Sequence, residues 1–288
     1  MQVKAYGKIN LYLDILDRRA DGFNNIETIF QTVNLHDTLT FEVRDRDLTM
    51  TCSDPSLENG DSNLVLCAAK LLQDRTGCDK GIHVHLEKRI PVAGGMAGGS
   101  VDAAATLRAL NKLWNLELDD AALHECAAEL GSDVPYCLIG GTVAATGRGE
   151  ILEPINPLPE TWFVLVQPPL GISAGEVYNH SALTRNEEKS INERTPSFTR
   201  ALELLHEGRI ADVMFNQMES AILTMHPELA ELKTHMLNMG CAAAIVSGSG
   251  PTLVGFCENE PATEQVSGSL SEAPVRVVNS TVQSIMVD

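Results

Sequence analysis

The sequence has few basic residues for its length. Its 288 residues contain 21 Lys and Arg against 39 Asp and Glu, which gives a formal net charge of −18. No cluster of Lys and Arg stands out, although a surface that binds nucleic acid or an anionic membrane needs one. We therefore expect neither nucleic acid nor a membrane as a partner. An anionic small substrate must find positive potential locally, from a few cations, backbone N–H groups or a metal ion.

Several other signals are absent. No apolar run is long enough to span a bilayer, and residues 1–6 contain no signal-peptide core. The seven cysteines are odd in number, and neither they nor the eight histidines show metal-site spacing. We expect a cytoplasmic protein with reduced cysteines in its core and no metal bound by a cluster of its own side chains.

The hydrophobic pattern predicts mixed strands and helices in an α+β fold. Strands are expected at 3–16, 26–33, 38–43, 81–90, 140–146, 163–167, 242–246, 252–256, 275–279 and 281–287. Helices are expected at 63–76, directly after residue 100, and at 119–130, 196–207, 211–225 and 227–239. The proline-rich stretch 154–159 predicts a boundary between two domains, 1–155 and 156–288.

A glycine-rich loop at a strand-to-helix junction is the strongest local signal. It reads Pro91-Val92-Ala93-Gly94-Gly95-Met96-Ala97-Gly98-Gly99-Ser100. Its backbone N–H groups and the helix N-terminus can converge on an anion, and glycines permit close approach of a phosphate. Ser100 is expected to cap the helix, and its hydroxyl could also meet phosphate or Mg²⁺. The loop matches neither the P-loop nor the Rossmann pattern, and a flexible connector is the alternative.

Three charged residues lie within or beside the predicted strands and helices. Lys8 lies inside the first strand, where a solvated lysine is the ordinary interpretation. Asp133 follows a helix stop, which is typical of a turn or N-cap aspartate. Asp102 falls in the first turn of the helix after the glycine loop, where a carboxylate favours the helix dipole. The local pattern alone assigns no catalytic role to any of them.

Three segments together resemble the GHMP kinases. They are Ala5-Tyr6-Gly7-Lys8-Ile9-Asn10-Leu11, the loop from Pro91 to Ala104, and Val246-Ser247-Gly248-Ser249-Gly250-Pro251. Further similar segments are 18–23, 27–31, 131–136 and 141–150, so the resemblance covers nearly the whole chain. It implies a ribosomal-S5-like N-terminal domain and a ferredoxin-like C-terminal domain, with the active site between them.

The resemblance also implies an ATP-dependent kinase and assigns roles to residues. Lys8 and Asp133 become the catalytic pair, with Asp133 as base and Lys8 as the orienting cation. ATP and Mg²⁺ are expected at the loop residues Pro91, Val92, Ala93, Gly94, Gly95, Met96, Ala97, Gly98, Gly99, Ser100 and Val101. Substrate contacts are expected from Asn10, Phe23, Asn24, Tyr178, Gly248, Ser249 and Gly250.

Within the family, the similarity is best to kinases of the non-mevalonate isoprenoid route. It implies a small phosphorylated alcohol that carries cytidine diphosphate as the acceptor, and a monomer or homodimer. Phe23-Asn24 stands where these kinases usually have Tyr-His, Ala174 where they have threonine, and Val101 where they have a second serine. A mevalonate-type or homoserine-type kinase, or a non-catalytic nucleotide-binding relative, are the alternatives.

Overall fold

The computed structural model describes residues 1–180, 183, 194–271 and 273–287. The strands in these ranges are β1 Gln2–Arg18, β2 Asn24–Arg44, β3 Leu48–Cys52, β4 Gly81–Glu87, β5 Thr142–Thr146, β6 Ile151–Pro154, β7 Trp162–Val166, β8 Phe215–Asn216, β9 Ala243–Val246, β10 Leu253–Cys257, β11 Val275–Asn279 and β12 Ile285–Val287. The helices are α1 Leu64–Thr76, α2 Gly98–Leu113, α3 Asp120–Leu130, α4 Val134–Ile139, α5 Ala174–Asn179, α6 Pro196–His206, α7 Ile210–Val213, α8 Glu219–Met225, α9 Pro227–Asn238 and α10 Glu260–Ser269.

A long antiparallel hairpin of β1 and β2 organises the first sheet. Gly22, with a φ of 87°, turns the chain between these strands, in a conformation that glycine adopts without strain. The sheet has eight strands in the described residues, with the main order β12-β1-β2-β4-β3; β5 and β6 extend from β2, and β8 pairs with β1. Ile9 and Leu11 of β1 lie in one hydrophobic core, whereas Leu13 and Ile15 lie in a second. The hairpin therefore joins the two cores.

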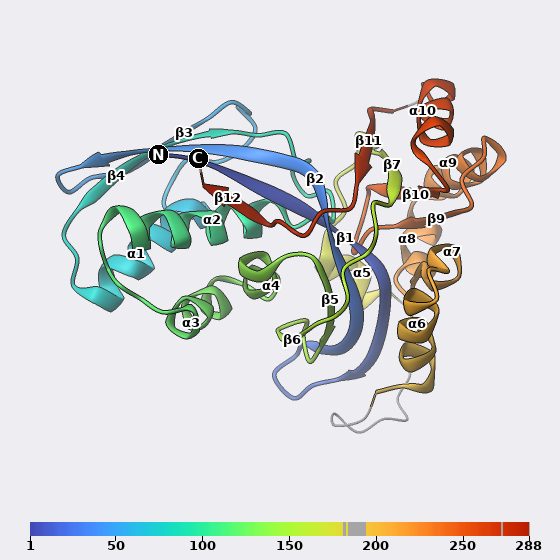
Figure 1. Cartoon of the computed structure of the whole chain (residues 1–288), viewed down its shortest axis with the longest axis horizontal. Coiled ribbons are helices and arrows are strands. Elements are labelled where there is room, and N and C mark those ends of the chain that lie inside the picture. Colours follow the sequence, from blue (N-terminus) through green and yellow to red (C-terminus); the bar gives the residue numbers. More distant parts are fainter. Residues whose placement is uncertain (181–182, 184–193, 272, 288) are drawn as a thin grey trace.

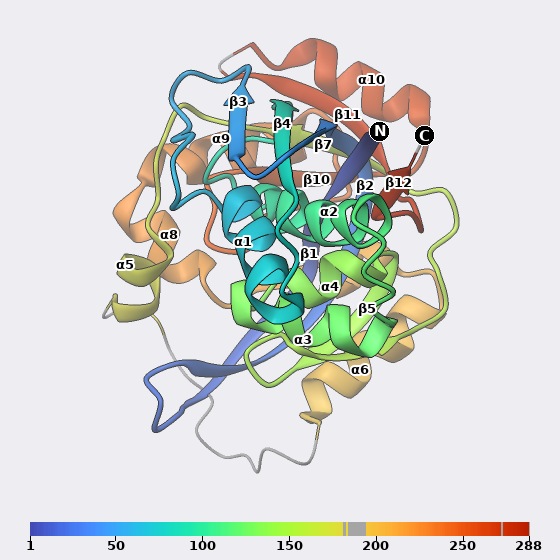
Figure 2. The same ribbon diagram turned by 90° about the vertical axis from the view of Figure 1, so that its left-hand side faces the viewer.

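Helices α1 to α4 pack against one face of the first sheet (Figures 1 and 2). Helix α2 buries an apolar stripe that includes Ala103, Leu107 and Leu110. Helix α1 begins after Asn63, whose side chain accepts a hydrogen bond from the Val65 amide, and ends at Gly77 with a φ of 71°. Both ends follow the capping signals in the sequence.

The second sheet is antiparallel throughout and has the order β11-β7-β10-β9. Numbered along the chain, its strands lie in the order 4-1-3-2, with helices α8 and α9 before β9 and α10 before β11. This is the β-α-β-β-α-β plan of a ferredoxin-like sheet. Together the two sheets confirm the predicted α+β class.

The division of the chain at residue 155 stays a prediction. Strand β12, from the C-terminal end, pairs with β1 through Val3↔Val287, and Figure 1 shows the two termini side by side. Strand β8 also pairs with β1, through Leu13↔Asn216. Two short segments of the second half therefore complete the first sheet. None of the helices in the described ranges is both long and apolar enough to cross a lipid bilayer.

Several predicted elements are wrong in detail. Residues 26–33 and 38–43 belong to one strand, β2, because its first half pairs with β5 and its second half with β4. The helix expected at 211–225 is broken into α7, β8 and α8. The break lies at Asn216, whose amide donates to the carbonyl oxygens of Val246 and Gly248 at 2.8 Å each. A tertiary contact thus overrides the local helical pattern.

Candidate active site

Two cavities meet at the glycine-rich loop between β4 and α2. The larger has a volume of about 580 Å³ and lies between the β1–β2 hairpin, α5 and the β9–β10 turn. The smaller has a volume of about 400 Å³ and lies between the loop, the start of α1 and residues 57–63. Gly95, Ala97 and Ser100 line both cavities. The loop therefore lies between the two cavities and borders both.

Lys8 and Asp133 face each other at this junction. The Lys8 side chain is buried, and its Nζ donates to Asn10 Oδ1 at 2.8 Å and lies 3.4 Å from Asp133 Oδ2. The ring of Phe30 packs beside this ammonium, with 5.0 Å from Nζ to the ring centroid. The Asp133 side chain is 33% exposed, so its carboxylate is accessible to a ligand in the larger cavity.

Asp133 stands at the N-cap position of α4, as its sequence pattern predicts, yet its side chain makes no capping hydrogen bond. The carboxylate lies beside Lys8 instead. An N-cap aspartate normally accepts a backbone amide, because this satisfies one of the unpaired donors of the first helical turn. Since no such bond forms here, the Asp133 carboxylate is not engaged in capping the helix.

Asn10 connects β1 to the other motifs. Its Nδ2 donates to Thr28 Oγ1 at 2.9 Å, and its backbone amide donates to Ser247 Oγ at 3.3 Å. The Ser247 hydroxyl in turn donates to the carbonyl oxygen of Gly95 at 3.0 Å. The three segments that carry the family resemblance are thus linked by hydrogen bonds around Asn10.

The conformation of the loop depends on close backbone contact. Gly95 has a φ of 73°, and a Cβ atom there would lie 2.0 Å from the carbonyl oxygen of Ser247. Ala93 and Ala97 also have positive φ values, 52° and 56°, which is uncommon outside glycine. Such strained residues persist where the surrounding structure holds them, often at functional sites.

Helix α2 begins at Gly98, directly after the loop, with Ala97 at its N-cap and no side-chain capping bond. The prediction that Ser100 caps this helix is wrong, because Ser100 lies within the first turn and faces both cavities. The sixteen-residue helix directs the positive end of its dipole, with uncapped backbone amides, toward the cavities. This arrangement suits an anion such as phosphate.

The structure separates the predicted loop residues into two groups. Nine of them line the smaller cavity: Pro91, Val92, Ala93, Gly94, Gly95, Ala97, Gly98, Gly99 and Ser100. Met96 and Val101 are instead buried in the hydrophobic core, and neither lines either cavity. The sequence pattern could not distinguish the two groups, because the two buried residues stand among the nine cavity-lining residues of one short segment.

Aromatic and amide side chains form the far end of the larger cavity. Phe23, Asn24 and Tyr178 all line it, as predicted for substrate contacts. Phe23 is 50% exposed, which is unusual for a large apolar ring and leaves a face open to a ligand. Burial raises the pKa of Tyr178 to about 12, with the nearby Asp133 carboxylate adding to the shift, so its phenol is neutral over the working pH range.

Two arginines of this cavity were not identified from the sequence. Arg18, at the end of β1, and Arg148, in the turn after β5, both line it. The Arg148 guanidinium carbon lies 4.9 Å from the centroid of the Phe23 ring, within cation–π range. The available signal for Arg148 was its position between Gly147 and Gly149, in a segment that resembles the family.

The turn between β9 and β10 completes the larger cavity. Gly248 and Ser249 line it, whereas the predicted contact Gly250 does not. Gly250 instead packs against the side chain of Val246, where a Cβ atom would lie 2.9 Å from Val246 Cγ1. Ala174 also lines the cavity, near Tyr178 on α5.

Comparison with known proteins identifies the family. The model of the GHMP kinases N terminal domain matches residues 63–141, and that of the GHMP kinases C terminal domain matches residues 187–275. A 4-diphosphocytidyl-2-C-methyl-D-erythritol kinase from Shouchella clausii (strain KSM-K16) is 39% identical over 269 residues, which cover 93% of this chain and 89% of that protein. A kinase of the same name from Bacillus cereus (strain B4264) is also 39% identical, over 93% of this chain and 92% of its own length.

Solved structures agree with these matches. The crystal structure of a 4-(cytidine 5′-diphospho)-2C-methyl-D-erythritol kinase superposes with a TM-score of 0.82 at 31% identity, over 97% of this chain and 99% of that chain. A mevalonate kinase from L. major, at 17% identity and a TM-score of 0.76, shares the fold over 99% of this chain and 96% of its own. On the strength of these matches and of its three linked motifs, this chain belongs to the GHMP kinase family.

Proposed function

We propose that this enzyme transfers the γ-phosphoryl group of ATP to the 2-hydroxyl of 4-(cytidine 5′-diphospho)-2-C-methyl-D-erythritol. The observation that carries the proposal is the junction of the two cavities, where Lys8 and Asp133 lie beside the loop residues that line both. Phosphoryl transfer requires this arrangement, because donor and acceptor must meet in line at the catalytic groups. The named relatives at 39% identity over most of the chain support the choice of acceptor.

Asp133 is the general base in this proposal. Its carboxylate accepts the proton of the acceptor hydroxyl as the hydroxyl oxygen bonds to the γ-phosphorus and ADP leaves. Lys8 orients this carboxylate and supplies positive charge near the transferred group. The hydrogen bond from Lys8 to Asn10 fixes the ammonium, so both groups are in place before the substrates bind.

The smaller cavity is the proposed nucleotide site. Gly94, Gly95 and Gly98 allow the loop to pack closely on the protein around this cavity, since a Cβ atom at each would lie within 3.0 Å of a neighbouring protein atom. The uncapped start of α2 suits the triphosphate. When bound, Mg²⁺ neutralises charge on the phosphates. In this proposal the ion is held largely by substrate phosphates and water, as is usual for Mg²⁺.

The larger cavity is the proposed acceptor site. Phe23 and Tyr178 are placed to stack on a base, and Asn24 offers both a donor and an acceptor to the base edge. Arg18 and Arg148 supply local positive charge for a diphosphate, against the net charge of −18 of the whole chain. In this proposal residues 1–155 hold the nucleotide and the catalytic pair, and residues 156–288 complete the acceptor site.

The alternatives make different demands on the same cavity. Mevalonate and homoserine carry no aromatic base, so Phe23 and Tyr178 would have no stacking partner in a kinase for either. A non-catalytic relative would not need Lys8 and Asp133 as a pair, yet both are present at the junction. These residues favour the cytidine-carrying acceptor and catalysis.

An assay of ADP release tests the proposal. The purified chain is supplied with Mg-ATP and, in turn, the cytidine diphosphate ester, mevalonate and homoserine. ADP release only with the cytidine diphosphate ester is the expected result, with phosphate transfer to its 2-hydroxyl checked by ³¹P NMR. Equal release with an acceptor that lacks the nucleobase, or release with none, would contradict the assignment.

A further inference from the structure

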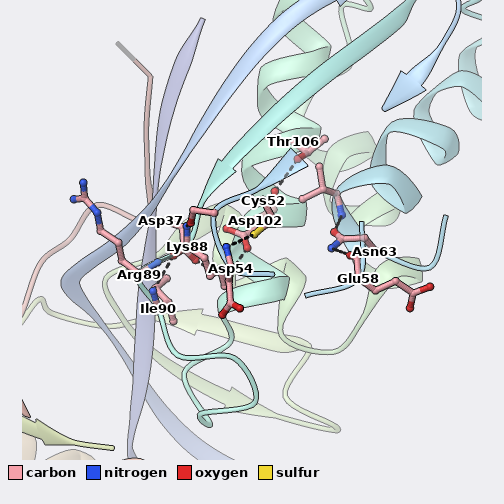
Figure 3. A network of polar contacts seen from close by, with 12 residues as sticks. Asp37, Cys52, Asp54, Glu58, Asn63, Lys88, Arg89, Ile90, Asp102 and Thr106 are labelled. Atoms are coloured by element: carbon pink, nitrogen blue, oxygen red, sulfur yellow. Dashed lines mark hydrogen bonds and ion pairs between the residues drawn. The ribbon is translucent and has the colours of Figure 1, made fainter. Parts of the chain in front are cut away.

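Three charged side chains form a buried cluster beneath the smaller cavity (Figure 3). The Lys88 ammonium donates to Asp37 Oδ2 at 2.5 Å and to Asp102 Oδ2 at 2.7 Å. The exposed fractions of these side chains are 0% for Asp37, 4% for Lys88 and 3% for Asp102. The catalytic pair and the acceptor cavity do not involve this cluster. Lys88 and Asp102 border the nucleotide cavity.

Asp37 connects the cluster to the N-terminal end of the glycine-rich loop. Its Oδ1 accepts the backbone amides of Arg89, at 2.5 Å, and Ile90, at 2.8 Å. These are the last two residues before Pro91, where the loop starts. Asp37 itself belongs to β2, in the middle of the first sheet. The start of the loop is therefore fixed to the sheet by one carboxylate.

Asp102 connects the same cluster to the C-terminal end of the loop. It is the fifth residue of α2, just past the first turn in which the sequence pattern had placed it, and so close to where the loop becomes helix. Because the Lys88 ammonium bonds to Asp37 and to Asp102, it joins the two ends of residues 91–97 (Figure 3). Gly98 makes room for this contact, since a Cβ atom there would lie 2.8 Å from Lys88 Nζ.

The electrostatics of the cluster indicate that it does more than add to the folding stability of the protein. Burial disfavours the charged form of Lys88, but Asp102 and Asp37 outweigh it and raise the pKa of Lys88, so the ammonium stays charged. Asp102 Oδ1 is buried and has no hydrogen-bond partner among the described residues. A buried ion pair with an unsatisfied oxygen contributes little net stability, and such groups can instead specify one geometry.

We infer that Lys88 is a positioning residue that, through Asp37 and Asp102, sets the distance between the start of the glycine-rich loop and the N-terminus of α2, and so shapes the nucleotide site. The inference rests on the proposed use of ATP. A loop held at both ends keeps its backbone amides aimed at the phosphates without reorganisation on binding. Residues that set such geometry influence ligand affinity even where they touch no ligand, because displacements of about 1 Å are costly.

The first experiment changes the cluster and measures nucleotide binding directly. The Kd for a non-hydrolysable ATP analogue is determined by calorimetry without acceptor, and KM for the acceptor is measured separately. Lys88→Met and Asp102→Leu should each weaken analogue binding about tenfold to a hundredfold, with acceptor KM changed less than twofold. Asp102→Asn keeps an acceptor oxygen for Lys88 and should restore most of the affinity lost in Asp102→Leu.

The Asp102→Leu result separates positioning from direct contact. If Lys88 served only as a cation for the nucleotide, the loss of Asp102 would leave Asp37 as its one carboxylate partner in the cluster, make its charge more available and strengthen analogue binding. Positioning predicts the opposite sign. Stronger or unchanged binding in Asp102→Leu would therefore overturn the inference.

The second experiment moves Lys88 without removing any charge and guards against variants that fail to fold. The added Cβ of Gly98→Ala would lie 2.8 Å from Lys88 Nζ and 3.0 Å from Ile90 Cγ2, whereas at Gly99 it would meet only Leu64 Cδ1, at 3.5 Å. Alanine favours helix at both positions, so a lower Tm in Gly98→Ala alone would report its close contacts and not a loss of helix. Gly98→Ala should weaken analogue binding more than Gly99→Ala does, and should add little in a Lys88→Met background.

Two outcomes decide this experiment. Additive losses in the double variant would mean that the methyl group acts on the nucleotide or through Ile90 and not through Lys88, and the inference would fall. The proposed function fails separately if the wild-type chain does not bind the analogue or releases no ADP with the cytidine diphosphate ester. Binding in the wild type with full affinity in Lys88→Met would remove the inference and leave the proposed function in place.

Discussion

At the scale of single residues, the position of the Asp133 carboxylate suits the proposed role of general base. It caps no helix, lies 3.4 Å from Lys8 Nζ and borders the acceptor cavity. Asp133→Asn should therefore lower kcat by about a hundredfold to ten-thousandfold, the usual cost of losing a general base. The Kd of an ATP analogue should change little, because the nucleotide cavity does not include Asp133.

Lys8→Ala should show the same division, with kcat reduced far more than nucleotide affinity. Steady-state kinetics and calorimetry on both variants check the expectation. A near-normal kcat in Asp133→Asn would refute the assignment of the base. Equal losses of kcat and analogue affinity would instead indicate that the pair shapes the site as a whole.

Gly95 tests the close contact between the loop and the turn after β9. Gly95→Ala would place a Cβ atom 2.0 Å from the Ser247 carbonyl oxygen, at a φ of 73°. Because the contact is backbone against backbone, neither side can yield cheaply. We expect loss of ATP-analogue binding and a Tm lower by several degrees, since about 1 kcal/mol lowers Tm of a chain of this size by about 2–4 °C.

Gly171→Ala is the matched control, because nothing lies within 4 Å of its added Cβ and it lines neither cavity. It should leave both binding and Tm near the wild-type values. If Gly95→Ala also kept both, the loop would be adaptable and the strain argument would be wrong.

Local patterns predicted few of these residue roles. The local pattern of Lys8 was typical of a solvated lysine, and that of Asp102 was typical of a carboxylate that favours the helix dipole. In the structure both side chains are buried, and each pairs with a residue that is not its neighbour in sequence: Lys8 with Asp133, and Asp102 with Lys88. The family resemblance assigned Lys8 and Asp133, and those roles stay predictions. Lys88 and Arg148 were missed because a charge among other charges, as in Glu87-Lys88-Arg89, or between two glycines carries no local signal of its partners.

At the scale of elements, Asn216 is the residue that breaks the helix expected at 211–225. It is buried, donates to Val246 and Gly248 and accepts the amide of Met218 at 2.9 Å. Asn216→Ala would leave these groups without partners, at about 1–3 kcal/mol for each buried group left unsatisfied. Urea unfolding should show a corresponding loss of stability.

The same variant should raise acceptor KM, because Asn216 holds the turn whose Gly248 lines the acceptor cavity. Asn238→Ala, at the exposed C-terminal end of α9, serves as the control and should change neither quantity. Unaltered stability in Asn216→Ala would show that the segment can rearrange at little cost.

Elements with local signals were predictable from the sequence. The ends of α1 and α3 follow their capping residues Asn63 and Asp119, and β7, β9 and β10 are short apolar runs. Helix α10 was missed because its apolar stripe is weak, although Asn259 and Pro261 gave a start signal. The two-residue strand β8 exists only through its pairing with β1, which no local pattern encodes.

At the scale of the whole molecule, the acceptor cavity combines residues from the β1–β2 hairpin with residues from the second half of the chain. Phe23 and Asn24 come from the hairpin, and Tyr178 comes from α5 (Figure 1). Aromatic stacking contributes about 1–3 kcal/mol per base, but it does not select among bases. Selection then requires hydrogen bonds at the base edge, for which the Asn24 amide has both a donor and an acceptor.

This division of labour gives a selective prediction. Phe23→Ala and Tyr178→Ala should each raise KM for the cytidine diphosphate ester by about tenfold, the equivalent of about 1.4 kcal/mol of lost stacking, and leave KM for ATP unchanged. Asn24→Ala should raise the same KM and also narrow the difference between cytidine and uridine esters, whose base edges present opposite hydrogen-bonding groups. Phe215→Ala, an exposed aromatic that lines neither cavity of the site, is the control. Unchanged acceptor KM in all three variants would remove the cytidine assignment, while membership of the GHMP kinase family would stand.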